Sequence, residues 1–117
     1  MKKAETFEDL WIWQEAKILV NEIYADFKDC HDFGFMRQIQ TAGISIMNNI
    51  AEGFERSTDP DFARFLDIAK GSSGEVRSMY YPAEDLEYIS GDVAVARRER
   101  AIKISKGIAS LISHLRA

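Results

Sequence analysis

The stretch "ISIMNNIAEGFER", residues 44–56, decides how this chain folds. Its apolar residues recur with helical spacing, yet Asn48, Asn49 and Gly53 stand among them. Asparagine and glycine are weak helix formers, because Asn competes for backbone hydrogen bonds and Gly loses the most backbone entropy. A helix that contains these residues is expected to use them in contacts with neighbouring helices. The stretch is therefore predicted to lie against other helices.

Apolar stripes at steps of three and four predict four helices. The first carries its main stripe at Trp13, Ala16, Val20, Ile23 and Phe27. The motif "STDP" offers a cap and a proline suited to a first helical turn, so it separates the second helix from the third. The four helices are expected over about residues 8–28, 33–56, 60–88 and 92–115.

Pro82 falls late in the third helix and must either kink it or end it. Leu86 and Ile89 continue the apolar signal, which favours a kink. Four helices of comparable length with short connections predict an all-α fold, an antiparallel up-down-up-down four-helix bundle. Its 117 residues suit one domain, residues 1–117, with a single core.

Composition narrows the class of protein. No apolar run approaches the roughly 20 residues of a membrane span, and the N-terminus lacks the apolar region of a secretory signal. Cys30 is the only cysteine, which fits a reducing cytoplasm. The net charge is −4 and the pI about 5.2, whereas proteins that grip phosphate backbones are more often basic.

A second face of the second helix is polar but uncharged. Residues 38–51 contain no charged side chain, so this helix is predicted to be covered on most of its circumference. Gln38 and Asn49 are expected to hydrogen-bond across a helix contact, because a buried amide without a partner costs about 1–3 kcal/mol. The predicted polar interface cluster comprises Gln38, Ser45, Asn49, Glu52, Ser72 and Glu75.

A single core cannot cover two faces of one helix, and another subunit is the simplest second covering. Trp11, Ile18 and Ala25 repeat every seven residues on a face of the first helix that is offset from its main stripe. A polar residue in an apolar helix contact often fixes the oligomeric state. These patterns predict an oligomer. The alternative is that both faces are simply exposed, as surface apolar residues often are.

Several motifs resemble one family. They are "SIMNNIAEG" at residues 45–53, "FLDIAKGSSGE" at 65–75, "FEDLWIWQEA" at 7–16, "NEIY" at 21–24 and "EYI" at 87–89. Together they resemble the proteins encoded in 23S rRNA intervening sequences, also called four helix bundle proteins. The resemblance covers essentially the whole chain. It implies an antiparallel four-helix bundle that assembles as a ring-like homopentamer.

The same resemblance bears on nucleic acid. A related member, the accessory protein of diversity-generating retroelements, binds nucleic acid and a reverse transcriptase. The family often has paired arginines where this chain has Gln40 and Thr41, so that element is missing here. Where the family often has a helix-kinking proline, Met47 stands, which predicts a straighter helix.

Candidate catalytic and metal-binding residues are few. Glu52 and Glu75 could form a carboxylate pair, but no nucleophile, phosphate loop or Ser/His/Asp arrangement accompanies them. Neither His31 nor His114 follows a Glu by three residues, as a di-metal bundle requires, and both are expected in solvent or at helix ends. No catalytic residue, metal site or cofactor is predicted, and the chain is not expected to be an enzyme.

Positive charge concentrates on the fourth helix, where Arg100, Lys103 and Lys106 are expected to form an outward arc. Repeated around a ring, such a patch would bind RNA or DNA through multivalency. The alternative is a solvated face paired with neighbouring acids. The candidate nucleic-acid contacts are Arg97, Arg98, Arg100, Lys103 and Lys106.

Two functions remain open from the sequence. The first is a non-catalytic, cytoplasmic, oligomeric protein that acts as a scaffold or adaptor. Its partner is a further copy of itself, with five copies implied by the family resemblance. The second is an accessory protein that binds RNA or DNA, or a protein associated with nucleic acid, through the fourth helix.

Overall fold

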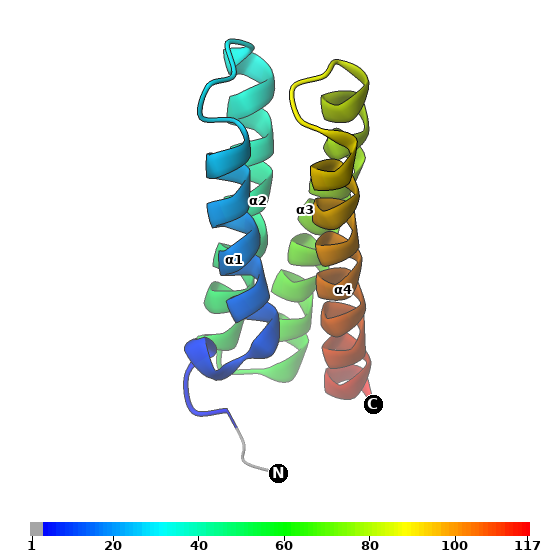
Figure 1. The fold of residues 1–117 in the computed structure, drawn as a ribbon. Helices are drawn as coiled ribbons and strands as arrows, with labels where there is room; N and C mark the ends of the chain where they lie inside the picture. Colours follow the sequence, from blue (N-terminus) through cyan, green and yellow to red (C-terminus); the bar gives the residue numbers. More distant parts are fainter. Residues whose placement is uncertain (1–3) are drawn as a thin grey trace.

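Each helix packs against the next along the chain, and the last packs back against the first (Figure 1). This arrangement comes from a computed structural model that describes residues 4–117. It confirms the predicted all-α up-down-up-down bundle, with overall dimensions of 43 × 22 × 20 Å. The elements are η1 (Phe7–Asp9), α1 (Trp11–Asp26), α2 (Phe33–Phe54), α3 (Asp59–Asp85) and α4 (Gly91–Arg116).

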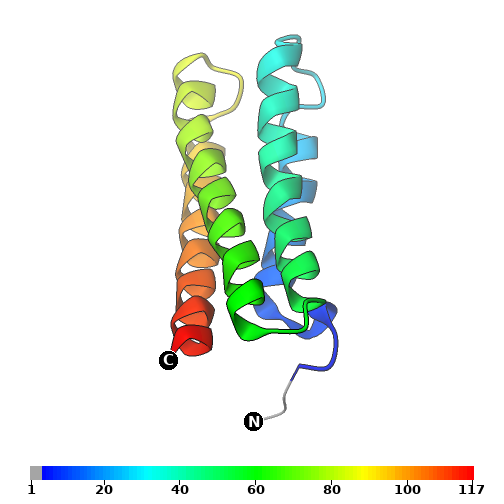
Figure 2. The same cartoon turned by 180° about the vertical axis from the view of Figure 1, so that it is seen from behind.

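The two ends of the bundle carry different connections. The α1–α2 and α3–α4 connections lie together at one end, at the top of Figure 1. The α2–α3 connection, η1 and the C-terminus lie at the other end, as the view from behind in Figure 2 also shows. We call the first the upper end and define it by residues 27–35 and 84–93.

The starts of α2 and α3 follow the capping rules. The Asp32 side chain accepts a hydrogen bond from the Phe35 N–H at 3.2 Å, so α2 begins at Phe33 as predicted. Thr58 Oγ1 accepts from the Asp61 N–H at 3.3 Å, and Pro60 lies in the first turn of α3. The strong local signals explain why these two boundaries were predictable.

The helix α3 runs past Pro82 and ends at Asp85, so the proline does not terminate it. The end is a Schellman motif, in which the Tyr88 N–H donates to Ala83 O at 2.9 Å and the Glu87 N–H to Glu84 O at 3.0 Å. Glu87 occupies the left-handed position with φ of 60°. Residues 86–88, predicted as helix, therefore form this turn.

The core-facing stripe of α1 is rotated from the predicted one. Ala16, Ile23 and Phe27 are buried as expected, but Trp13 and Val20 are only half-buried. Their places in the core are taken by Ile12 and Leu19. The predicted and the observed stripe both have helical spacing. The Trp13 ring packs against Phe7 of η1, with ring centroids 5.1 Å apart.

Two glycines of α2 lie where neighbouring helices approach closely. A Cβ at Gly53 would be 2.8 Å from Phe65 Cβ and 2.9 Å from Phe62 Cδ1, at the start of α3. A Cβ at Gly43 would be 2.7 Å from Ile23 Cδ1 of α1. The glycine in the opening stretch is thus required by packing, while Ile39, Ile46 and Ile50 fill the core beside it.

Within one chain, α2 is not covered on most of its circumference. Gln38, Thr41, Asn48 and Glu52 are exposed, and Asn49 is half-buried. The second face of α2 therefore lies partly on the surface of the single subunit, with Ser45 half-buried like Asn49. Within residues 4–117, no helix combines the length and the apolarity that crossing a membrane requires.

Candidate functional site

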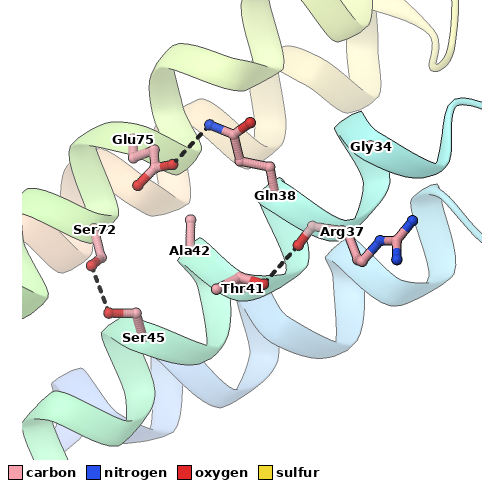
Figure 3. A pocket seen from close by; sticks show the side chains of 8 residues that line it. All are labelled: Gly34, Arg37, Gln38, Thr41, Ala42, Ser45, Ser72 and Glu75. Atoms are coloured by element: carbon pink, nitrogen blue, oxygen red, sulfur yellow. Dashed lines mark hydrogen bonds between the residues drawn. The ribbon is translucent and has the colours of Figure 1, made fainter.

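An open polar groove follows the outer side of α2 and α3 (Figure 3). Figure 3 shows Arg37 pointing away from α3, while Gln38 faces Glu75 and Ser45 faces Ser72. The groove has a volume of about 440 Å³ and is lined by Gly34, Arg37, Gln38, Thr41, Ala42, Ser45, Ser72 and Glu75. We call it the α2–α3 groove.

Short polar contacts cross this groove from helix to helix. Ser45 Oγ and Ser72 Oγ lie 2.8 Å apart, and Gln38 Nε2 donates to Glu75 Oε2 at 3.3 Å. Asn49 Nδ2 donates to Ser45 Oγ at 3.0 Å, which extends the serine pair by one residue. Five of the six residues in the predicted polar cluster are therefore brought together along one side of the bundle.

The sixth residue and one predicted contact differ from expectation. Glu52 lies outside the cluster, because its carboxylate pairs with Arg56 one turn later at 3.1 Å. Asn49 does not bridge two helices, since its amide donates to Ser45 O of its own helix at 2.8 Å. A short side chain one turn away from a carbonyl reaches it more easily than it reaches a neighbouring helix. Gln38 does bridge two helices, but it is exposed.

Glu52 and Glu75, considered as a carboxylate pair, are both exposed and have separate partners. Neither is in the apolar surroundings that the sequence suggested. His31 and His114 are both exposed, as expected. Among residues 4–117, no group of three or more His, Cys, Asp or Glu side chains is arranged to hold a metal ion.

The opposite side of the bundle is joined by charge. Arg97 of α4 forms a two-pronged contact with Asp26 of α1, at 2.7 and 2.9 Å, and reaches Glu22 at 2.7 Å. Arg100 contacts Glu15 at 2.7 Å and Glu22 at 2.8 Å. Buried Glu22 Oε1 has the close Arg100 Nε but not the alignment of a hydrogen bond. We call these five residues the α1–α4 seam.

Burial strengthens the α1–α4 seam. Only 8% of the Asp26 side chain and 18% of the Arg97 side chain are exposed. The hydrogen bonds to Asp26 raise the pKa of Arg97, although burial works in the other direction. Tyr80 of α3 donates its hydroxyl to Asp26 Oδ2 at 2.8 Å, and burial raises the pKa of Tyr80. Both shifts favour the protonated form of the group.

The expected outward arc on α4 is wrong for Arg100, which lies against α1 within the α1–α4 seam. Arg98 is also engaged: it pairs with Glu84 at 3.0 Å and stacks on the Tyr81 ring at 4.1 Å. Lys103 and Lys106 are exposed. The three arginines thus match the alternative that the sequence left open, a helix face paired with neighbouring acids.

Beside the α1–α4 seam lies an apolar strip on α1. Trp11 is 48% exposed and Ile18 40%, and Ala25 is exposed as well. Lys103 Nζ lies 5.9 Å from the Trp11 ring, and a Cβ at Gly107 would be 3.1 Å from it, so the strip borders α4. The sequence placed these three residues on one face, and we call them the α1 strip.

Sequence reasoning missed two surface features. Tyr81 is 51% exposed beside a groove of about 300 Å³ that Gly74, Arg77 and Ser78 also line. The adjacent pair Tyr80-Tyr81 could have indicated the exposed ring. Neighbouring helical residues point about 100° apart, so only one of the two enters the core. The second feature is the upper end, where Phe33 and Leu86 are 54% and 56% exposed. Each stands at a helix terminus, where periodicity is weakest.

Comparisons with known proteins agree with this architecture. Residues 8–110 match the family described as 23S rRNA-intervening sequence protein. A crystal structure of a protein of unknown function from the S23 ribosomal protein family of Bacteroides thetaiotaomicron superposes with a TM-score of 0.81. The two chains are 23% identical over 86% of this chain and 97% of the other, a likeness that shows the fold. No curated protein sequence matches this one.

Proposed function

The chain belongs to the 23S rRNA-intervening sequence protein family, and we propose that it works as a self-associating, non-catalytic helical scaffold in the cytoplasm. One observation carries the proposal: two different sides of the bundle carry uncovered surface with few charged side chains. They are the α1 strip and the α2–α3 groove. Copies of the chain can join through these two different surfaces.

The bundle's topology supports a repeating assembly. The α1 strip borders α4, whereas the groove lies between α2 and α3, on the opposite side of the bundle. When one surface of a chain meets a different surface of the next, the contact is head-to-tail and closes into a ring if the rotation allows it. Five copies is the number that the family resemblance implies.

Desolvation favours the same surfaces. The cross-helix contacts of the groove are mostly made by neutral hydroxyl and amide groups, and only Arg37 and Glu75 among its lining residues are charged. Covering such a surface avoids the desolvation penalty that buried charges carry. The strip supplies Trp11, an aromatic of the kind enriched in interface cores.

Light scattering of the purified chain tests this function. The wild type is expected to show a mass several times 13.3 kDa, and Trp11→Ser combined with Ile18→Ser should lower it. Val95→Ser is the matched control, because Val95 is 45% exposed but lies on α4 outside both surfaces. A monomeric wild type, or a double variant with unchanged mass, contradicts the proposal.

A second candidate function, binding of single-stranded RNA or DNA, rests on Tyr81. Its exposed ring is stacked by Arg98 and borders the groove that Arg77 lines. An aromatic ring beside guanidinium groups is a platform on which nucleobases stack. Lys103 and Lys106 are the members of the predicted basic patch that stay exposed.

Fluorescence anisotropy with labelled single strands at low salt tests the second candidate. Tyr81→Ala is expected to weaken binding several-fold, since stacking on an aromatic contributes about 1–3 kcal/mol per base. Lys106→Glu is the comparison that separates the platform from the α4 lysines. Binding unaffected by Tyr81→Ala would leave only the α4 patch, and an absence of binding would remove this function.

A further inference from the structure

The upper end of the bundle has a concentrated net negative charge. Its two segments, residues 27–35 and 84–93, contain six acidic side chains and one lysine. Their formal charge of −5 exceeds the −4 of the whole chain. Five of the six carboxylates are exposed, and the sixth, Glu84, pairs with Arg98.

Part of this charge opposes the stability of the fold. Glu84, Asp85 and Glu87 stand at the C-terminus of α3, whose last turn contains no basic residue. The C-terminus of a helix is the negative end of its dipole, so carboxylates there are unfavourable. Asp32 and Asp92, at the starts of α2 and α4, are placed favourably. Glu84 is offset by Arg98, so Asp85 and Glu87 are the two carboxylates that need another explanation than helix capping.

The same end holds the two most exposed large apolar side chains of residues 4–117. They are Leu86 at 56% and Phe33 at 54%. The Schellman turn gives no reason for Leu86, because its customary apolar contact joins positions occupied by Ala83 and Tyr88. Phe33 begins α2 beside Asp32, and Leu86 lies between Asp85 and Glu87, so each exposed apolar side chain has acidic neighbours in the sequence.

A cavity lies between the two connections at this end. It has a volume of about 480 Å³ and is lined by Asp26, Asp29, Cys30, His31, Asp32, Glu87 and Tyr88. Tyr88 Oη donates to Asp32 Oδ2 at 2.7 Å and so ties the two connections together. That hydrogen bond lowers the pKa of Asp32, so it favours the charged form of this carboxylate.

We propose that the upper end binds a basic, partly apolar segment of a partner protein, with Arg or Lys entering the cavity and apolar side chains resting on Phe33 and Leu86. The charge complementarity selects this occupant, because a guanidinium pairs well with carboxylates such as Asp29 and Glu87. Nucleic acid is repelled by the same charge. The surface lies at an end, whereas the α1 strip and the α2–α3 groove lie on the sides. Binding of the basic segment therefore does not require self-association of the chain.

Short fluorescein-labelled helical peptides of Lys, Arg, Leu and Ala, varied in spacing, test the proposal by anisotropy. A matched set carries Ser in place of Leu, and another carries Glu in place of Lys and Arg. The wild-type protein is expected to bind the basic amphipathic peptides, with affinity falling as salt rises. The Ser set should bind more weakly, and the Glu set should not bind.

Variants locate the site. The triple variant Asp29→Asn, Asp85→Asn, Glu87→Gln should weaken binding roughly tenfold, since it removes three exposed charges whose ion pairs each contribute modestly. It should also keep or raise stability, because it relieves the α3 dipole, so unfolding cannot imitate the loss. Leu86→Ser should weaken binding several-fold. The control, Glu8→Gln, Glu55→Gln, Asp59→Asn, removes three exposed acids outside the upper end.

Three results overturn the proposal: no basic peptide binds, the triple variant binds as the wild type does, or the control variant loses as much affinity. The Trp11→Ser, Ile18→Ser variant separates this site from self-association. Its mass reports on the scaffold, whereas its peptide affinity per chain is expected to match the wild type.

Discussion

The α1–α4 seam is joined by charged side chains, whereas the α2–α3 groove on the opposite side is joined mainly by hydroxyl and amide groups. In the seam, two arginines and three carboxylates lie largely covered within a single chain. In the groove, the Gln38–Glu75 contact is exposed and the Ser45–Ser72 contact is half-buried.

The difference separates two tasks of one small bundle. Largely buried charges must find their partners, so the α1–α4 seam favours one pairing of helices over others. Neutral polar groups can be covered later without a large desolvation penalty, so the groove stays available for another chain. Stability should therefore respond to substitutions in the seam, and assembly to substitutions in the groove.

The largest expected effect comes from Arg97→Met. The substitution removes the cation that Asp26 and Glu22 share. Asp26 then keeps its negative charge with only 8% of its side chain exposed. Unfolding in urea should show a loss of about 3 kcal/mol, because breaking a largely buried ion pair strands the remaining charge. Lys103→Met, on the exposed part of α4, is the control and should change little. An equal loss of stability in the two variants would contradict the claim that the seam stabilises the fold.

Tyr80→Phe tests the hydroxyl that joins α3 to the seam. The ring stays in the core, and only the donor to Asp26 Oδ2 is lost. The free energy of unfolding should fall by about 1.5–2 kcal/mol, near the low end of the net value of a hydrogen bond to a charged group. In a double-mutant cycle with Asp26→Asn, additive effects would mean that the hydroxyl and the carboxylate do not interact in solution.

Ser72→Ala is the matching change in the groove. It removes one side of the Ser45–Ser72 contact, but the Ser45 hydroxyl keeps Asn49 and has access to water. The loss of stability should be about 0.5 kcal/mol or less. A loss as large as that of Arg97→Met would show that the groove, and not the seam, holds the helices in place.

Tyr88→Phe gives the smallest effect, at the exposed upper end. The Tyr88 hydroxyl lowers the pKa of Asp32, so its removal should raise that pKa toward the ordinary value. A carboxylate with a lowered pKa contributes stability above its unfolded pKa, and this contribution is lost as the pH falls through the folded pKa. NMR titration of Asp32 should therefore move to higher pH. An unchanged titration would contradict the contact.

Most of the fold could be predicted because its signals are local. The "STDP" boundary and the stripes of α2 to α4 depend on neighbours within one or two turns, and α2 begins at Phe33 as expected. The α1 stripe was harder, since Trp13 and Leu19 both fit helical spacing and only packing separates them.

The pairing of charges could not be predicted. Arg97 meets Asp26 and Glu22 across 71 and 75 residues, and an arginine on a helix looks the same in sequence whether solvated or paired. Asn49 shows the opposite case: a cross-helix bond was expected, but a carbonyl one turn earlier is nearer. The members of the polar cluster were identifiable, while their individual partners depend on the three-dimensional arrangement.

The most direct test of the two tasks is one substitution in the groove, Thr41→Lys, with mass and stability measured on the same sample. Thr41 is exposed, lines the groove beside Arg37, and Lys favours helix more than Thr does. Ser113→Lys on the exposed face of α4 is the control. Light scattering should show Thr41→Lys falling toward 13.3 kDa while helix content is kept and the control stays assembled. An unchanged mass, or a monomeric wild type, would contradict the account.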